Sequence, residues 1–262
     1  MPLSFVRPVE FGSSVQSDST GGTPAAGLVS LSTSAPLIVS ARQVRLSRMR
    51  SGVLTSARLL TEGLQQGGFR FRVAMITLTY AEANTWGPRH VSRMLEAVAK
   101  YLARLGHRLR CVWVSELTKA GRVHYHVALW LPRGVSLPKP DKRGWWPHGL
   151  TRIEWVRKGI AYLAKYVSKG EEIGTFPKGL RLHGVRGLDV VQRREKAWWR
   201  SPAWLREQWG IEHGPRRVAR VGWVSQLTGE IVRSPWVIIE RGPRWSWVKL
   251  ARVGGNAALV TS

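Results

Sequence analysis

The sequence predicts an α+β fold in which helices pack on a central antiparallel sheet. Between residues 69 and 170, segments typical of strands and helices follow one another in the order strand, helix, strand, strand, long loop and helix. The second and third strands are separated only by the turn "TKAG", so they form a hairpin and pair antiparallel. We expect the helices to lie together on one face of this sheet.

The chain before residue 69 contains two regions of different composition. Residues 1–40 are rich in Ser, Thr, Gly, Pro and Ala, and their charged residues are Arg7, Glu10 and Asp18, which is typical of a disordered tail. Residues 41–68 form a basic lead-in that predicts one or two amphipathic helical pieces. Its first part, "ARQVRLSRMR", is either a DNA contact or a solvated basic face.

The first strand and the first helix of the main domain come next. Residues 69–80 end in "FRVAMITLTY", whose β-branched and aromatic residues predict a strand. In residues 90–106, apolar side chains recur every three or four positions, which predicts an amphipathic helix that ends at Gly106. These apolar side chains are Val91, Met94, Leu95, Val98, Leu102 and Leu105. Residues 109–117 and 122–131 are the two strands of the hairpin.

The second half of the chain begins with a loop rich in Pro and Gly, residues 131–149. We then predict a helix over residues 152–170, and we expect residues 69–170 to form one domain. Residues 171–262 are an extension to which the sequence assigns no role. Within it, "SPAWLREQWG" predicts a short Trp-rich helix, and "RVGWVSQLTGEIVRSPWVII" predicts a β-hairpin that turns at "TGE".

The charge of the chain is unusual for a globular protein. The sequence has 41 Lys and Arg residues against 16 Asp and Glu residues, which gives a net charge of +25 and a pI near 11.6. A surplus of this size predicts a polyanionic partner, with nucleic acid as the first candidate and an anionic membrane as the second. The membrane is the weaker candidate because no apolar run approaches the roughly 18–20 residues that span a bilayer.

Cysteine usage and the N-terminal segment favour the cytoplasm. Cys111 is the single cysteine, which excludes an internal disulfide framework and a Cys-rich zinc site. The segment "MPLSFVRPVEFGSS" lacks the basic start and apolar stretch of a secretory signal. Most of the 14 tryptophans are expected in the core, and those in "WWPHG" and "AWWRSPAW" could instead stack on unpaired bases.

Two histidines stand one residue apart in the segment "GRVHYHVALWLP". Alternate side chains of a strand face opposite sides, so His124 and His126 share one face while Tyr125 lies on the other. Two imidazoles at this spacing can both reach one divalent ion, and Glu116 is the natural third ligand because the hairpin turn brings it back toward His124. The alternative is that the histidines are exposed or hydrogen-bonded and bind no metal.

Two tyrosines stand one helical turn apart in the segment "YLAKYVSK". On a helix, Tyr162 and Tyr166 share a face with Lys158, Lys165 and Lys169, and two phenols beside three ammonium groups suit a phosphate. An apolar stripe lies next to this face and consists of Val156, Ile160, Leu163 and Val167. The alternative is an ordinary amphipathic helix with tyrosines at the rim of the core and solvated lysines.

Taken in order, three motifs resemble those of the HUH endonucleases that initiate rolling-circle replication. They are the Thr-rich strand end "MITLTY", the His-apolar-His strand "VHYHVAL" and the tyrosine helix "YLAKYVSK". The double tyrosine is most similar to the initiators of small single-stranded DNA phages, and the tyrosines follow the histidines, unlike in conjugative relaxases. The resemblance covers residues 69–170 and implies an HUH/RRM-like palm.

The resemblance also implies a site and a reaction. Glu116, His124 and His126 would bind Mg²⁺ or Mn²⁺, and Tyr162 and Tyr166 would attack DNA in turn, leaving a 5′-phosphotyrosine and a free 3′-OH. Further residues would support these roles. Lys165 and Lys169 would stabilise the phosphate or the leaving group, and the DNA contacts would include Thr77, Thr79, Lys158 and Arg122.

The expected partners are single-stranded or supercoiled origin DNA and, in the cytoplasm of a bacterial host, a host helicase and polymerase. The helicase is expected from the host because the sequence has no G-x-x-x-x-G-K-[ST] segment. Two other functions stay open at this point. One is a non-enzymatic, basic protein that binds single-stranded nucleic acid, and the other is an HUH-type tyrosine transposase.

Overall fold

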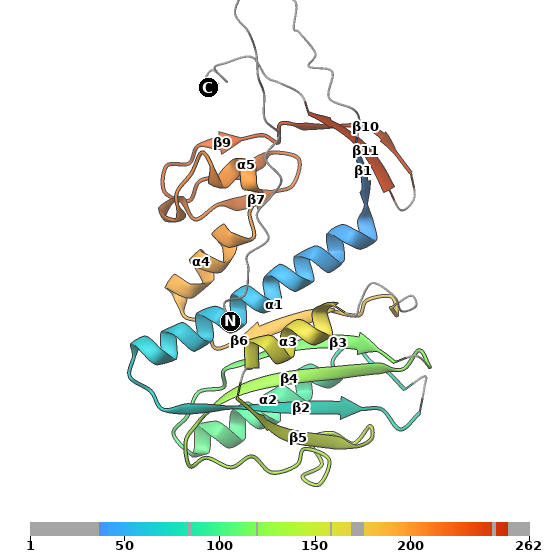
Figure 1. Cartoon of the computed structure of the whole chain (residues 1–262), viewed down its shortest axis with the longest axis vertical. Coiled ribbons are helices and arrows are strands. Elements are labelled where there is room, and N and C mark those ends of the chain that lie inside the picture. Colours follow the sequence, from blue (N-terminus) through green and yellow to red (C-terminus); the bar gives the residue numbers. More distant parts are fainter. Residues whose placement is uncertain are drawn as a thin grey trace, which may run out of the picture.

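The computed structural model describes residues 37–82, 85–118, 120–157, 159–168, 176–242 and 245–250. Its centre is a five-stranded sheet with the strand order β5-β2-β4-β3-β6, in which every neighbouring pair is antiparallel. The strands are β2 (Phe71–Thr79), β3 (Cys111–Leu117), β4 (Val123–Pro132), β5 (Thr151–Val156) and β6 (His183–Arg186). The predicted α+β class and the predicted hairpin are therefore confirmed (Figure 1).

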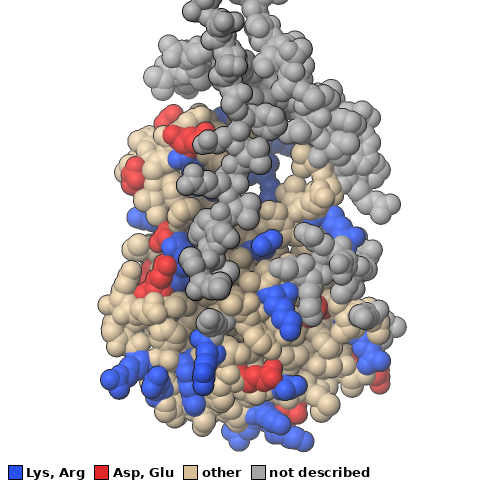
Figure 2. All heavy atoms as spheres, in the orientation of Figure 1, with Lys and Arg blue, Asp and Glu red and all other residues tan. Residues whose placement is uncertain are grey.

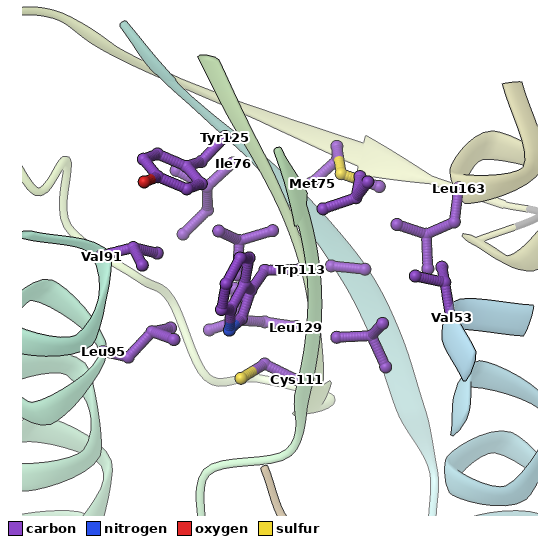
Figure 3. Packing of buried hydrophobic residues seen from close by; sticks show 14 of the residues in the cluster. Val53, Met75, Ile76, Val91, Leu95, Cys111, Trp113, Tyr125, Leu129 and Leu163 are labelled. Carbon is purple, nitrogen blue, oxygen red and sulfur yellow. The ribbon is translucent and has the colours of Figure 1, made fainter. Parts of the chain in front are cut away.

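Helices cover both faces of the sheet, so the expectation that they share one face is wrong. They are α1 (Ala41–Gln66), α2 (His90–Arg104) and α3 (Gly159–Ser168). In Figure 3, Leu95 of α2 faces the side of the sheet that carries Tyr125, whereas Val53 of α1 and Leu163 of α3 face the opposite side. The physical reason lies in β4, where consecutive residues such as Val127 and Ala128 are both apolar and fully buried, so both faces need a cover.

The helix predicted over residues 152–170 is also wrong in its first third. Thr151–Val156 form the edge strand β5, which pairs with β2, and α3 begins only at Gly159. Val156 lies opposite Val73 of β2 and is therefore not part of an apolar helix stripe. The hydrogen bonds that β2 offers at its free edge outweigh a local apolar spacing that also suits a helix.

The remaining predicted helices differ from the observed ones mainly at their ends. The region 41–68 contains one helix of 26 residues, whose buried side chains, including Val53 and Leu60, rest on the sheet. The helix predicted over 90–106 ends at Arg104, with Leu105 as its C-cap and Gly106 in the left-handed region at φ 77°. No helix among the described residues is long and apolar enough to cross a membrane.

The C-terminal extension contains the predicted Trp-rich helix and hairpin together with elements that the sequence did not predict. The predicted ones are α5 (Ala203–Arg206) and the strands β8 (Gly222–Val224) and β9 (Ile231–Val232), which with β7 (Arg216–Val218) make a small sheet. The additional ones include α4 (Val190–Trp199), the 3-10 turn η2 (Ile211–His213) and β6, which joins the edge of the five-stranded sheet. Asp189 and Gln192 form a capping box at the start of α4, which is the signal that could have identified this helix.

A third sheet joins the two ends of the described chain. It consists of β1 (Leu37–Ser40), β11 (Trp245–Leu250) and β10 (Trp236–Arg241), in that order. Of the expected N-terminal tail, residues 37–40 thus form a strand, and residues 1–36 lie outside the described residues. In the view of Figure 2, Lys and Arg side chains outnumber acidic ones over the part of the surface that the five-stranded sheet and its helices form.

Candidate functional site

The histidine pair lies on β4, the middle strand of the sheet, between β2 and β3. The register places His126 opposite Thr77 of β2, and it places His124 between Thr79 of β2 and Glu116 of β3. Residues directly opposite in an antiparallel pair point to the same face, so these five side chains share one patch. The structure therefore gathers three expected metal ligands and two expected DNA contacts on the face that α1 and α3 cover.

His126 is held at both ring nitrogens. Its Nε2 lies 2.7 Å from Oε2 of Glu116, and its Nδ1 lies 3.3 Å from the hydroxyl of Thr77. The residue is 4% exposed, so this ring has little freedom to turn. Because a threonine hydroxyl can donate or accept, Thr77 can support either neutral tautomer of the imidazole.

His124 is half-buried beside the same carboxylate. Burial lowers the pKa of His124 below its ordinary value, and the neighbouring His126 and Arg122 lower it further, while Glu116 opposes them. A lowered pKa keeps the imidazole neutral at pH 7, and a neutral imidazole has the lone pair that a metal ion or a donor hydrogen needs.

The tyrosine helix lies directly over this patch. The ring of Tyr166 stacks on the ring of His126 with centroids 3.5 Å apart and planes 19° apart, and the Tyr162 ring lies 5.4 Å from that of Tyr166. Tyr166 is 9% exposed. Burial raises the pKa of its phenol above the ordinary value, and Tyr162, Glu116 and Glu154 add to the shift. Tyr166 is therefore protonated at neutral pH in this state.

Glu154 belongs to the same site, although the sequence analysis did not identify it. The hydroxyl of Tyr162 donates a hydrogen bond of 3.1 Å to Oε2 of Glu154, and Arg152 forms an ion pair of 2.8 Å with the other carboxylate oxygen. Glu154 stands on β5, opposite Met75. The helix predicted over residues 152–170 does not place Glu154 on the sheet; an acid within a strongly basic segment is the signal that could identify it.

The other expected site residues have different surroundings. Lys165 of α3 and Arg122, which precedes β4, are exposed, and Arg122 is close enough to influence the pKa of His124. Lys158 and Lys169 lie outside the described residues. Of the tryptophans expected to pack or to stack on bases, Trp146 is buried and donates to the carbonyl of Thr79, while Trp199 is 42% exposed.

The expected ligands of a divalent ion fit it in part. Two donor atoms that bind one ion at right angles, each at about 2.1 Å, lie about 3 Å apart. Glu116 and His126 present such a pair of atoms, and His124 shares their face. Within the described residues, however, no three His, Cys, Asp or Glu side chains are close enough to form a complete metal site in this conformation.

Residues 73–171 match the family model of the replication-associated protein ORF2/G2P. The matched segment runs from β2 to just beyond α3, so it contains the histidine patch, Glu154 and both tyrosines. It does not contain α1 or the C-terminal extension. No curated protein and no solved structure matches the chain. The family match supports a role in the initiation of replication and, with it, DNA as a partner.

Proposed function

We propose that this protein initiates rolling-circle replication by nicking origin DNA, single-stranded or supercoiled, through attack by a tyrosine of α3. The observation that carries the proposal is the stack of Tyr166 on His126, whose Nε2 is hydrogen-bonded to Glu116. The ring of a candidate nucleophile therefore lies 3.5 Å from the ring of a residue that could bind a metal. The similarity of residues 73–171 to a replication-associated family supports the same function.

In the proposed reaction a phenol oxygen forms a bond to phosphorus, and the bond from phosphorus to the 3′ oxygen of the preceding nucleotide breaks. The phenol loses its proton, the 3′ oxygen gains one, and the DNA is left with a 5′-phosphotyrosine and a free 3′-OH. Glu116, His124 and His126 would hold Mg²⁺ or Mn²⁺, which stabilises negative charge on the phosphate when bound. Thr77 and Glu116 orient the ring of His126 through its two nitrogens.

Glu154 can act as the proton acceptor for Tyr162. Its carboxylate already accepts the hydrogen bond of the Tyr162 hydroxyl, so it can take the proton as Tyr162 attacks. Tyr166 is more buried, has a raised pKa and stands next to the first tyrosine. We therefore assign the first cleavage to Tyr162 and the second to Tyr166.

Two neighbouring nucleophiles allow one protein to open and close a strand. After a host helicase and polymerase have regenerated the origin, the second tyrosine cleaves it, and the released 3′-OH attacks the first phosphotyrosine. The covalent link conserves the phosphodiester, so rejoining needs no nucleotide cofactor. Lys165, exposed on the same helix, can stabilise the negative charge of the phosphate under attack.

The test is a covalent-capture assay on circular single-stranded and supercoiled DNA of the replicon that encodes the chain. With Mn²⁺ we expect nicked or linear DNA that carries the protein on its 5′ end. Tyr162→Phe and Tyr166→Phe should each keep part of the cleavage, and the double variant should lose it. Uncut DNA with both metals would overturn the proposal.

A second function is favoured by one observation. Because Glu116 and His126 already satisfy each other and Tyr166 is buried, these residues could serve packing alone in a protein that binds single-stranded nucleic acid. This alternative predicts that the double tyrosine variant and the wild type bind DNA equally and that neither becomes attached to it. A tyrosine transposase that uses one nucleophile would instead lose all cleavage with a single Tyr→Phe change.

A further inference from the structure

A second group of basic side chains lies outside the tyrosine site, where α1, β6 and α4 meet. His183 of β6 is close to Lys196 and Arg200, at the end of α4, and Arg200 is close to Arg48 of α1. A cavity of about 510 Å³ adjoins them, and Arg45 and Arg181 line it together with Arg48 and His183. We call these six residues the α1–α4 cluster: Arg45, Arg48, Arg181, His183, Lys196 and Arg200.

Among the described residues, no acidic side chain is ion-paired with the α1–α4 cluster. Glu195, the acid next to Lys196 in sequence, is bonded to Arg58 instead. Lys196 is half-buried, whereas the four arginines of the cluster are exposed. Cations that lie close together repel one another, and a bound anion would relieve that repulsion.

Burial and, to a smaller extent, neighbouring positive charges lower the pKa of two members of the cluster. Burial lowers the pKa of Lys196 to about 8, and the positive charge of Arg200 contributes to this shift. Burial also lowers the pKa of His183 to about 4, with Lys196 and Arg200 adding to the shift. Each of these shifts would be reduced by an anion held between the side chains.

The fold holds the cluster in place. His183 lies against α1 at Gly52, where a Cβ atom would come within 2.6 Å of the ring Nε2, so the close approach depends on glycine. Arg45 donates to the carbonyl of Leu180 at 2.8 Å and fixes the segment that leads into β6. Gln192 of α4 donates to the carbonyl of Leu59 at 2.8 Å and fastens α4 to α1. Because Arg45 and His183 are already held, their part of the site forms at low cost in conformational entropy.

The cluster lies on the same face of the sheet as the tyrosine site. One cross-strand row runs from Thr77 through His126 and Val114 to His183. Neighbouring strands are about 4.8 Å apart, so His183 lies about 10 Å along the sheet from His126. The same helix, α1, packs against α3, which carries the tyrosines, and against α4, which carries Lys196 and Arg200.

We propose that the α1–α4 cluster is a phosphate-binding site and that its ligand is a backbone phosphate of the DNA strand that flanks the nick. Arginine forks and a lysine recognise phosphate oxygens, and the apolar wall of the cavity, formed by Val44, Leu180 and Leu182, suits the sugar that follows the phosphate. The DNA assignment rests on the proposed function. The phosphate chemistry itself does not, and a free phosphate ion would meet the same side chains.

The test compares Arg48→Gln/Arg200→Gln with a control of equal charge change, Arg216→Gln/Arg217→Gln on the exposed strand β7. Binding of a fluorescent single-stranded oligonucleotide is measured at several salt concentrations. Loss of this one phosphate contact should weaken binding about tenfold at low salt and reduce the slope of log K against log salt by about 0.7. The control should change both quantities much less.

A second measurement separates DNA from free phosphate as the ligand. Inorganic phosphate is added to the full chain, and the shift in melting temperature is compared between the wild type and Arg48→Gln/Arg200→Gln. If phosphate stabilises only the wild type while oligonucleotide binding is the same in both, the site takes free phosphate and the DNA assignment is overturned. If neither measurement distinguishes the cluster variant from the control, the site itself is overturned.

The proposed nicking function can fail without affecting this result. Covalent capture reports on the tyrosines, whereas the binding and melting measurements report on the α1–α4 cluster. Wild-type protein that binds the oligonucleotide with the expected salt slope but never cuts it would refute the nickase and leave the phosphate site in place.

Discussion

Thr77 helps to set the orientation and the tautomer of the His126 imidazole. Its hydroxyl is the partner of Nδ1, while Glu116 is the partner of Nε2. We expect Thr77→Val, which keeps the shape of the side chain but removes the hydroxyl, to weaken Mn²⁺ binding by about ten- to a hundredfold. Titration of the DNA-free protein followed by electron paramagnetic resonance measures this directly. Thr79→Val is the matched control, and equal affinities of the two variants would contradict the role given to Thr77.

Glu154 accepts a hydrogen bond from the hydroxyl of Tyr162 and is therefore the expected proton acceptor of this tyrosine. Glu154→Gln keeps the shape but removes the carboxylate that can take a proton. In a Tyr166→Phe background, where only Tyr162 can attack, we expect the cleavage rate to fall by about 10²-fold or more. The rate of covalent adduct formation in a single turnover is the measurement.

The control for Glu154 is the same change in a Tyr162→Phe background. Cleavage there depends on Tyr166, so Glu154→Gln should slow it by much less. Equal losses in the two backgrounds would show that Glu154 stabilises the site as a whole and is not the proton acceptor of Tyr162.

At the scale of elements, the position of β5 depends on one close approach of the backbone. Gly149, which precedes β5, has φ 153°, and a Cβ atom there would collide with the carbonyl oxygen of Thr79 at the end of β2. We expect Gly149→Ala to lower the free energy of unfolding by at least about 2 kcal/mol because the backbone itself would have to move. Urea unfolding measures this loss.

Gly144 provides the comparison for Gly149. It also has a positive φ, 68°, but a Cβ atom there would meet nothing within 4 Å. Gly144→Ala should therefore cost only the strain of its backbone conformation, about 1 kcal/mol. If both substitutions lower the free energy of unfolding equally, the close approach of β5 to the end of β2 is not the reason for glycine at position 149.

The elements also show which parts of the site a sequence can predict. Strict alternation in β4 places His124 and His126 on one face, and the short hairpin places Glu116 opposite His124, so local periodicity was sufficient for this part. Glu154 was not predictable in the same way. Its position depends on the pairing of β5 with β2, and the paired residues are at least 73 positions apart in the chain, as 151 − 78 = 73 for Thr151 and Leu78. Local spacing carries no information on such a partner.

At the scale of the whole molecule, the segment that matches the replication-associated family shares its hydrophobic core with parts of the chain outside it. The family match covers residues 73–171, yet α1 supplies Val53 and Leu60 to the core above the histidine face. A sheet with one solvated face would have no such apolar cover on that face. The alternation of β4 alone suggests such a sheet, which is why helices were expected on one side. The packing of α1 on the sheet can be inferred from its apolar residues only when both faces of β4 are known to be apolar.

Cys111 provides a probe for the cooperativity of this assembly. It lies at the start of β3, fully buried between the sheet and α2, and burial raises the pKa of its thiol to about 12 (Figure 3). At pH 8 only about one thiol in ten thousand is then ionised, and the thiolate is the reactive form. We expect Cys111 to resist alkylation in the native protein and to react as urea unfolds it, with the same midpoint as the loss of circular dichroism. Because Cys111 is the single cysteine of the chain, mass spectrometry of the alkylated protein reads this one site. Labelling that precedes the loss of helix signal would show that α2 leaves the sheet before α1 does and that the two faces of the core unfold separately.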